Sequence, residues 1–503
     1  MMGRKARIFR PIESITLDAL VPADHFYRHV ERSLNLSFVR DLVAGCYAVG
    51  GRPSIDPVVF FKLQLVMFFE GIRSERQLMD LAADRLSVRW YLGYDLHEPL
   101  PDHSSLTRIR DRYGLAIFRR FFETIVEHCQ RAGLVWGQEL YIDATQVKAN
   151  ASLDSLAPRF AVEAHLASLF NPEADRASQP HMAPAPIAPL ESTSTATAEL
   201  AEENASRHDW LARMGRPDRR VQRGGYQRRS NFEASWTDPD ASLMFHKSAG
   251  LRVGYHDHLV VDGGKARVIL AALVTPAEVM ENQPALDLLW HTCFRWRLRP
   301  RQVTGDTTYA TGENIRALEG AGIHAYLPLA DWDRTVFYGP SRFTYETEHD
   351  RYRCPEGHTL RRYSYRAADE AVAYRADGAT CNACPVKAAC TTSNRGRMIH
   401  RSVYTEDFDR VRAYHDTPAY AKAMSKRKVW VEPLFGEAKQ WHGLEQFRLR
   451  GLVKVNGEAL LIAAGQNLKR LLSWRGWGRR PWPSGAAGVR LSRQLDSPMP
   501  ARS

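Results

Sequence analysis

Apolar residues recur with helical spacing through residues 15 to 130 of this 503-residue chain. The stretch DPVVFFKLQLVMFFEG is apolar on most sides, which predicts a buried helix with Pro57 in its first turn. Ser74 and Gln77 have the spacing of a capping box for the next helix. Asp102 then begins a short basic helix, and Gly114 is expected to end it. The pattern therefore predicts an all-helical N-terminal region.

From Gln138 onward the pattern becomes that of strands. Residues 140–142 are apolar and rich in strand-forming types, and Asp143 is expected to follow the end of this strand. Two apolar strands flank residues 262–265, DGGK, which is a hairpin signal. A helical segment follows to about Trp296, then a strand that ends on Asp306, then the strand GIHAYLPL. The amphipathic stretch VEPLFGEAKQWHG and the apolar stretch EALLIAAGQNLKRLLSW predict two C-terminal helices.

Three segments lack the pattern of a folded core. Residues of about 155–245 are rich in Pro, Ala, Ser and Thr, which is typical of a linker or insertion. Within them, residues 218–230 hold five arginines and one acid, as expected of an arm that contacts a nucleic-acid backbone. The basic tail, residues 476–503, is expected to be disordered. The predicted divisions are therefore 1–130, 131–475 and 476–503, with a cysteine-rich insertion at about 340–400.

Charge adds a partner to this picture. Lys and Arg number 69 against 57 Asp and Glu, a net charge of +12, which suggests an anionic partner and nucleic acid first. The basic N-terminus, MMGRKARIFRPIE, is not followed by the apolar region of a secretory signal, and no stretch approaches the ~20 apolar residues of a membrane span. Seven cysteines in so long a chain do not form a disulfide scaffold. We expect a cytoplasmic protein without a membrane partner.

The N-terminal helices allow two interpretations. Helix, tight turn, helix and a further basic helix is the outline of a helix-turn-helix domain, in which Arg108, Arg110 and Arg112 would contact DNA. The alternative is a helical packing domain whose arginines are merely solvated. The pattern alone leaves both open.

Acids at strand and helix ends carry the candidate chemistry. The order is a strand with Asp143, a hairpin, a helix, a strand with Asp306, a strand, and a helix with Glu432. This is the element order of a ribonuclease H-like core, a mixed sheet with helices on its faces. Such acids converge on two divalent cations, and Mg²⁺ prefers carboxylates and phosphate oxygens as ligands. We therefore expect an α+β, or α/β, multidomain chain with an N-terminal all-helical domain and a ribonuclease H-like catalytic domain.

Four stretches taken together resemble the DDE transposases of bacterial insertion sequences. They are GIRSERQL…VRWYLGYDL…PDHSSLTRIRDRYG, YIDATQVKANAS, VTGDTTYATGENIRAL and VEPLFGEAK…RLRG, and they occur in the family's order over nearly the whole chain. The resemblance implies a transposase that binds the terminal inverted repeats of its insertion sequence and target DNA, acts as a homodimer on DNA near the nucleoid, and cleaves and joins strands with two Mg²⁺ ions, which Mn²⁺ can replace.

The resemblance also assigns residues. It implies that Asp143, Asp306 and Glu432 are the catalytic, metal-binding acids, and Tyr309 matches the family's D-x-x-Y. Lys439 matches the lysine of the Y-x2-R-x3-E-x6-K signature, which is expected to contact DNA phosphate.

This chain departs from that signature at two positions. Ser425 replaces its tyrosine and Lys428 its arginine, which puts those two roles in doubt; the neighbouring Arg427 is a candidate replacement. We predict that Glu432 is the third acid and not Glu437, because Lys439 shares a helical face with Glu432 and Glu437 is turned by about 140°.

Four cysteines form a second candidate site. Cys354, Cys381, Cys384 and Cys390 include a C-x-x-C knuckle and could hold a structural Zn²⁺ in a zinc-ribbon-like segment. His358 competes for the fourth ligand position. The alternative is four reduced thiols in a small loop.

Two other functions fit the same residues. One is a DNA-binding regulator derived from a transposase, against which the three intact acids argue. The other is a metal-dependent nuclease that does not join strands, because the same acids serve both steps.

Overall fold

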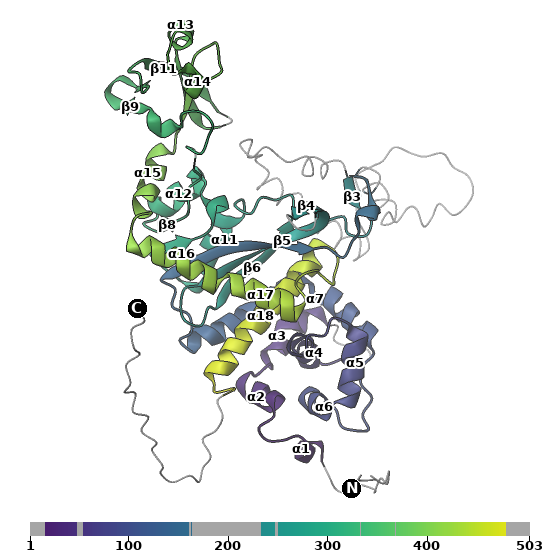
Figure 1. Ribbon diagram of the computed structural model, residues 1–503. Helices are drawn as coiled ribbons and strands as arrows, with labels where there is room; N and C mark the ends of the chain where they lie inside the picture. The colour runs from purple at the N-terminus through teal and green to yellow at the C-terminus, as the bar shows by residue number, and fades with distance from the viewer. Residues whose placement is uncertain are drawn as a thin grey trace, which may run out of the picture.

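The computed structural model describes residues 16–47, 54–159, 162, 233–246, 250–331, 333–367 and 369–478. Most of the predicted polar insertion, including residues 218–230, and the tail from residue 479 lie outside the described residues. Three layers follow one another in space: the N-terminal helices, a mixed sheet, and a cysteine-rich module at the far end (Figure 1). In the described part of the chain, no helix is both long and apolar enough to cross a membrane.

The N-terminal region is helical, as predicted. Asp56 caps α4 with Pro57 in the first turn, and Ser74 caps α5 by accepting from the backbone N–H of Gln77. The elements are α1 Leu17–Leu20, α2 Phe26–Ser33, α3 Phe38–Val43, a 3₁₀ turn Ala44–Cys46, α4 Pro57–Glu70, α5 Glu75–Asp84, α6 Leu86–Leu92 and α7 His103–Arg131.

α7 is longer than the pattern predicted. Gly114 has the left-handed φ of 64° and interrupts the helix, but a second helical piece continues to Arg131. A glycine adopts this φ without a steric penalty, so the chain bends at Gly114 and then resumes the helix. The residues after Gly114 are apolar on one face, which gives them a core to bury against.

A six-stranded mixed sheet forms the centre of the molecule. Its order is β4-β5-β1-β7-β8, with β6 paired to β5. β5 is antiparallel to β1, β4 and β6, while β1, β7 and β8 are parallel. The strands are β1 Glu139–Lys148, β4 Ser242–His246, β5 Gly250–Asp262, β6 Ile269–Pro276, β7 Gln302–Thr304 and β8 His324–Tyr326. α11, Ala285–Trp296, and α12, Gly312–Gly320, connect β6, β7 and β8, and a short pair, β2 Leu156–Pro158 and β3 Glu233–Ser235, lies apart.

β1 does not end at Asp143, so that prediction is wrong. The strand continues to Lys148, and Asp143 lies opposite Leu259 of β5. On the other side, pairing with β7 stops at Tyr141. The long β5 supports β1 along one edge, whereas on the other edge β7 stops at Tyr141 and the next pairing is at Lys148, with Gln446. Asp143 therefore lies two residues beyond the parallel pairing with β7 and not at the end of the strand.

The predicted hairpin is present as β5 and β6, joined by residues 263–268. The carboxylate of Asp262 accepts hydrogen bonds from the backbone N–H groups of Trp136, Gly137 and Gly264. These bonds offset the cost of burying the charge and fix the loop that leads into β1.

The C-terminal helix α18, Leu452–Trp474, joins the sheet to the N-terminal helices. The side-chain amide of Asn467 bonds to both backbone groups of Ile269, and that of Asn456 does the same at Val274. These amides satisfy the free edge of β6, which a helix cannot otherwise do.

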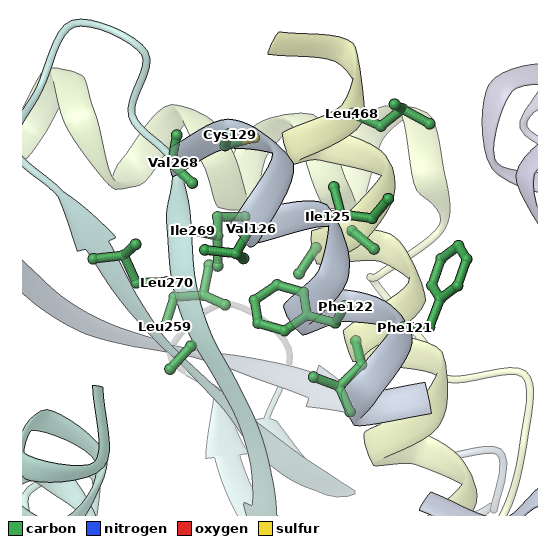
Figure 2. Packing of buried hydrophobic residues seen from close by; sticks show 14 of the residues in the cluster. Phe121, Phe122, Ile125, Val126, Cys129, Leu259, Val268, Ile269, Leu270 and Leu468 are labelled. Atoms are coloured by element: carbon green, nitrogen blue, oxygen red, sulfur yellow. The ribbon is translucent and has the colours of Figure 1, made fainter. Parts of the chain in front are cut away.

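Apolar packing between α7, α18 and β6 completes this joint. Figure 2 shows Phe121, Ile125 and Cys129 of α7 beside Leu468 of α18 and Ile269 of β6. One buried cluster runs through the N-terminal helices, the sheet and α18. The helical region and the sheet therefore share a core.

The cysteine-rich module is a second, five-stranded sheet of order β13-β12-β11-β10-β9. Its strands are β9 Thr344–Glu346, β10 Arg351–Arg353, β11 Thr359–Arg366, β12 Ala371–Ala376 and β13 Met398–Ser402, with the short helices α13 Gly378–Asn382 and α14 Lys387–Cys390. It has its own small core, which includes Leu360 and Tyr374. The chain then returns to the central sheet through α15 Thr405–Tyr414, α16 Pro418–Trp430 and α17 Glu432–His442.

Candidate active site

The three predicted acids come together from three elements. Asp143 lies on β1 just beyond its pairing with β7, Asp306 follows the end of β7, and Glu432 is the first residue of α17. Because β1 and β7 are parallel neighbours, their chain directions bring Asp143 and Asp306 to the same end of the sheet. Burial, opposed by Arg427 and reinforced by Asp306 and Glu432, raises the pKa of Asp143 to about 6. Asp306 and Glu432 thus both lie within electrostatic range of Asp143.

Arg427 of α16 provides the positive charge at this site. Its Nη2 lies 2.9 Å from Oδ2 of Asp143, and its Nη1 lies 3.9 Å from Oε1 of Glu432. The side chains of Arg427 and Asp143 are 14% and 9% exposed, so this pair is largely removed from water. Arg427 therefore points toward the acids, whereas the next residue, Lys428, is exposed.

Asp306 also fulfils a structural task. Its Oδ1 accepts a hydrogen bond from the backbone N–H of Thr308 and caps the turn Thr307–Tyr309. Capping uses one oxygen and leaves the other available, so this bond orients the carboxylate without consuming it. Tyr309 is buried behind it, and its hydroxyl has no hydrogen-bond partner among the described residues.

Glu281 is a fourth acid at this site, which the sequence reasoning missed. Burial, together with the nearby Asp306 and Asp143 and opposed by Arg427, raises its pKa to about 7. Its Oε1 lies 3.9 Å from Nε2 of His256. Glu281 belongs to the loop between β6 and α11, and no sequence pattern separates it from Glu278 of the same loop, which pairs with Arg159.

Glu437 is directed away from this cluster. It pairs with Lys469 at 2.5 Å and with Arg470 at 3.5 Å, both on α18, and lies 3.7 Å from His442. Burial alone would raise the pKa of Glu437, but the hydrogen bonds from His442 and Lys469 and the charge of Arg470 bring it well below its usual range. α17 begins at Glu432 with Pro433 in its first turn, which resolves where that helix starts.

Lys439 is half-buried on α17. Burial lowers its pKa, while Glu445 and Asp257 oppose that change. Asp257 is fully buried on β5, and burial raises its pKa to about 8, with Lys439 opposing. The signature lysine therefore faces a buried acid of the central sheet.

The N-terminal arginines differ in their surroundings. Arg108 and Arg112 are exposed. Arg110 is buried and ion-paired with Glu75, and burial together with the nearby Arg448 lowers its pKa to about 10. The prediction that Arg110 contacts DNA is therefore withdrawn, because its guanidinium is held inside the molecule between α5 and α7.

The four cysteines of the module converge. Burial raises the pKa of Cys390, and the other three cysteines raise it further while Arg397 lowers it. Backbone N–H groups point at two of the sulfurs, that of His358 at Cys354 and that of Arg397 at Cys381. All seven cysteines are free thiols.

Neither cluster encloses a metal position as it stands. In the described ranges, no group of three or more His, Cys, Asp or Glu side chains is arranged closely enough to hold an ion. The donor types nevertheless fit. Carboxylates with one arginine counterion leave a net negative charge suited to a hard cation, and four thiols suit zinc.

Comparison with known proteins assigns the chain. Residues 15–112 match a family described as a transposase domain (DUF772), and residues 353–472 match a family described as a transposase DDE domain. The second match contains Glu432, Lys439 and the four cysteines. No curated protein and no solved structure matches the chain. The two family matches identify the chain as a DDE transposase of an insertion sequence.

Proposed function

We propose that this transposase binds the ends of its insertion sequence and catalyses metal-dependent cleavage and transfer of DNA strands. The observation that carries the proposal is the convergence of Asp143, Asp306 and Glu432, from β1, the end of β7 and the start of α17, where Asp143 is buried and Arg427 is its charge partner. One arginine does not balance three carboxylates, which favours a bound cation in the working state.

The sheet supports a ribonuclease H-like catalytic core. β5 is antiparallel to β1 on one side and to β6 on the other. β7 and β8 follow on the far side of β1, and both are parallel to it. Helices cross between β6, β7 and β8. This arrangement brings Asp143 of β1 beside Asp306, which follows β7.

Asp143, Asp306 and Glu432 would hold two Mg²⁺ ions, with Mn²⁺ able to replace them. Bound there, the ions would supply a polarised phosphate and an activated water or 3′-hydroxyl. The protein's own contribution is positional. The bond from Thr308 fixes Asp306, β5 fixes Asp143, and the N-terminus of α17 favours the charge of Glu432.

Basic side chains would hold the DNA around this centre. Lys428 is exposed and Lys439 is half-buried one helix further on, so both can meet phosphates that approach the acids. Arg108 and Arg112 present a basic helix surface for the terminal repeats, as in a helix-turn-helix domain. Two ends must be processed together, which favours a homodimer on DNA in the cytoplasm, at the nucleoid.

The cysteine-rich module would carry one structural Zn²⁺ on Cys354, Cys381, Cys384 and Cys390. The N–H groups directed at two of the sulfurs are the donors that stabilise thiolates. His358 contributes its backbone N–H to Cys354, which favours Cys354 over the imidazole as the fourth ligand.

The experiment compares full-length variants on a supercoiled plasmid that carries the two ends of the insertion sequence. Asp143→Asn and Asp306→Asn should abolish Mg²⁺-dependent cleavage and leave binding to end DNA nearly unchanged, because an amide removes the charge that attracts the cation. Retained cleavage in either variant would remove that residue from the centre. Wild-type protein that cleaves but never joins ends to a target would be a nuclease, and protein that binds without cleaving would be a regulator.

A further inference from the structure

One face of the module sheet is rich in arginine. Directly opposed residues of neighbouring strands share a face, and successive residues alternate. Leu360 of β11 and Tyr374 of β12 are buried in the module core. Their neighbours Arg361 and Arg375, which oppose each other in the register, therefore lie on the other face. We call this second face the outer face.

The register extends the outer face across the sheet. Arg351 opposes Arg361, Arg366 opposes Ala371, and His400 opposes Ala373, which is two residues from Arg375. Arg361, Arg366 and His400 are exposed. The outer face therefore carries arginines from β10, β11 and β12, with His400 of β13 beside them.

Acids only partly neutralise this face. Glu346 pairs with Arg351 and Arg353, and Asp369 pairs with Arg366. Arg361 and Arg375 have no carboxylate within ion-pair distance in the described part of the chain. Two guanidinium groups are thus free to meet an anion.

A tyrosine orients one of these guanidinium groups. A bulge in β11 lies between Arg362 and Ser364, at Tyr363. The Cζ atom of Arg375 lies 3.7 Å from the centre of the Tyr363 ring, which is 54% exposed. Stacking on an aromatic ring holds an arginine planar while leaving its N–H donors at the rim. Arg375 thus covers one face of the Tyr363 ring.

We propose that the outer face binds the phosphate backbone of duplex DNA, at a distance from the catalytic acids and without regard to sequence. Arginines without a carboxylate partner on neighbouring strands fit a row of phosphates, and the stacking of Arg375 on Tyr363 orients its donors for such a contact. The module stands beyond the central sheet, on the side away from the N-terminal helices (Figure 1), so it would lengthen the DNA path across the protein. This inference rests on the proposed function, because it assumes that DNA lies against the chain.

The test measures binding of the full-length protein to a random-sequence duplex several helical turns long, over a series of salt concentrations. The variant is Arg361→Gln with Arg375→Gln. Its matched control is Arg362→Gln with Arg401→Gln, which removes the same charge from residues of the same sheet whose register places them with Tyr374, on the core side. Zinc content and thermal unfolding check that each module is intact.

Each lost phosphate contact should reduce the slope of log K against log salt by about 0.9. We expect the slope of the outer-face variant to be smaller in magnitude than that of wild type by about 1.8, and the slope of the control to equal that of wild type. Arg361→Lys with Arg375→Lys should restore most of it. If the double variant unfolds, each single variant should lose about 0.9.

Equal slopes for wild type, variant and control would overturn this inference while leaving the proposed function standing. A preference of the outer face for single strands, seen as a slope loss confined to single-stranded probes, would also overturn it. Wild-type protein that binds no duplex at all would instead refute the proposed function.

Discussion

Two glutamates five positions apart on α17 have opposite surroundings. The side chain of Glu432 is 56% exposed and its nearest charge is Arg427, while that of Glu437 is 20% exposed and meets Lys469, Arg470 and His442. A residue surrounded by three cationic or donor groups has no capacity left for a metal. The helical turn between them therefore separates the catalytic role proposed for Glu432 from the structural contacts of Glu437.

Glu432→Gln should abolish Mg²⁺-dependent cleavage, whereas Glu437→Gln should stay within about tenfold of wild type in rate, since only the first removes a charge from the centre. Glu437→Gln should lower the melting temperature instead, because it leaves Lys469 and Arg470 without their acid. Cleavage rate and thermal unfolding of both proteins check this. The reverse pattern would move the third acid to Glu437.

Glu281 is the second residue whose surroundings predict a role. Glu281→Gln should reduce cleavage by about tenfold or more and weaken Mn²⁺ binding, because it removes a charge within range of Asp143 and Asp306. Glu278→Gln is the control from the same loop, and its partner is Arg159. Titration calorimetry with Mn²⁺ gives a measure that does not depend on turnover. Equal Mn²⁺ affinity in both variants would leave Glu281 as a packing residue.

At the scale of elements, the start of α18 is held by a buried acid outside the active site. Asp238, which is fully buried, accepts from the hydroxyl of Tyr255 at 2.7 Å and from the backbone N–H of Gly451 at 3.1 Å. Burial raises the pKa of Asp238 to about 6, although these two bonds oppose the change. The start of α18 is therefore held by a carboxyl group that stays protonated to a higher pH than an ordinary Asp.

A carboxyl group with a raised pKa in the folded state stabilises the fold least when it is ionised. Its contribution is fully present below pH ~4 and is lost as the pH rises to about 6. Asp238→Asn cannot ionise, so its free energy of unfolding relative to wild type should improve by about 2–3 kcal/mol between pH 4 and pH 7. Denaturant unfolding at the two pH values measures this. A pH-independent difference would show that Asp238 is ionised throughout.

The module should depend on zinc while the central sheet does not. Cys384→Ser should remove about one equivalent of zinc and make residues 340–400 sensitive to proteolysis, because a small sheet with few apolar residues lacks a sufficient core of its own. Elemental analysis and limited proteolysis measure both effects. Cys129→Ser, a buried cysteine of α7, is the control and should retain the metal. Zinc-free wild-type protein made with adequate metal would refute the site.

At the scale of the whole molecule, the N-terminal helices cannot be separated from the sheet without exposing their shared core. A fragment that begins near residue 131 would lose α4 and α7 and is therefore a poor test of DNA recognition. Replacing exposed side chains in the full-length protein is a better test of DNA recognition.

Arg108→Gln with Arg112→Gln should weaken binding to end DNA more than to random DNA, because we expect this helix to recognise the terminal repeat. Competition binding at one salt concentration measures the ratio. Arg119 and Arg120 are exposed residues further along α7, and their replacement by Gln is the control. An equal loss on both DNAs would make the N-terminal arginines backbone contacts only.

The sequence predicted the helices and strands but not which of them lie side by side. Pro57 in the first turn of α4, the cap at Ser74 and the β5–β6 hairpin follow from local residues, and the structure confirms them. The length of β1 depends on β5, more than a hundred residues away, so no local signal shows that the strand passes Asp143.

Burial explains the other residues whose surroundings the sequence did not predict. From the sequence, Arg110 is expected to be a surface cation, but in the folded chain it lies beside Glu75 and Arg448. Glu281 is expected to be an ordinary loop acid, but it lies near Asp143 and Asp306. Both depend on packing between distant segments. The order of the acids along the chain was visible because each is attached to a regular element.

The amides of α18 on the edge of β6 have a consequence for synthesis. α18 is the last element of the described chain, and until it is made, β6 has an unpaired edge and α7 an apolar face without cover. A ribosome that stops before residue 452 therefore releases a chain with both surfaces open, and such a chain should aggregate more readily than one that includes α18.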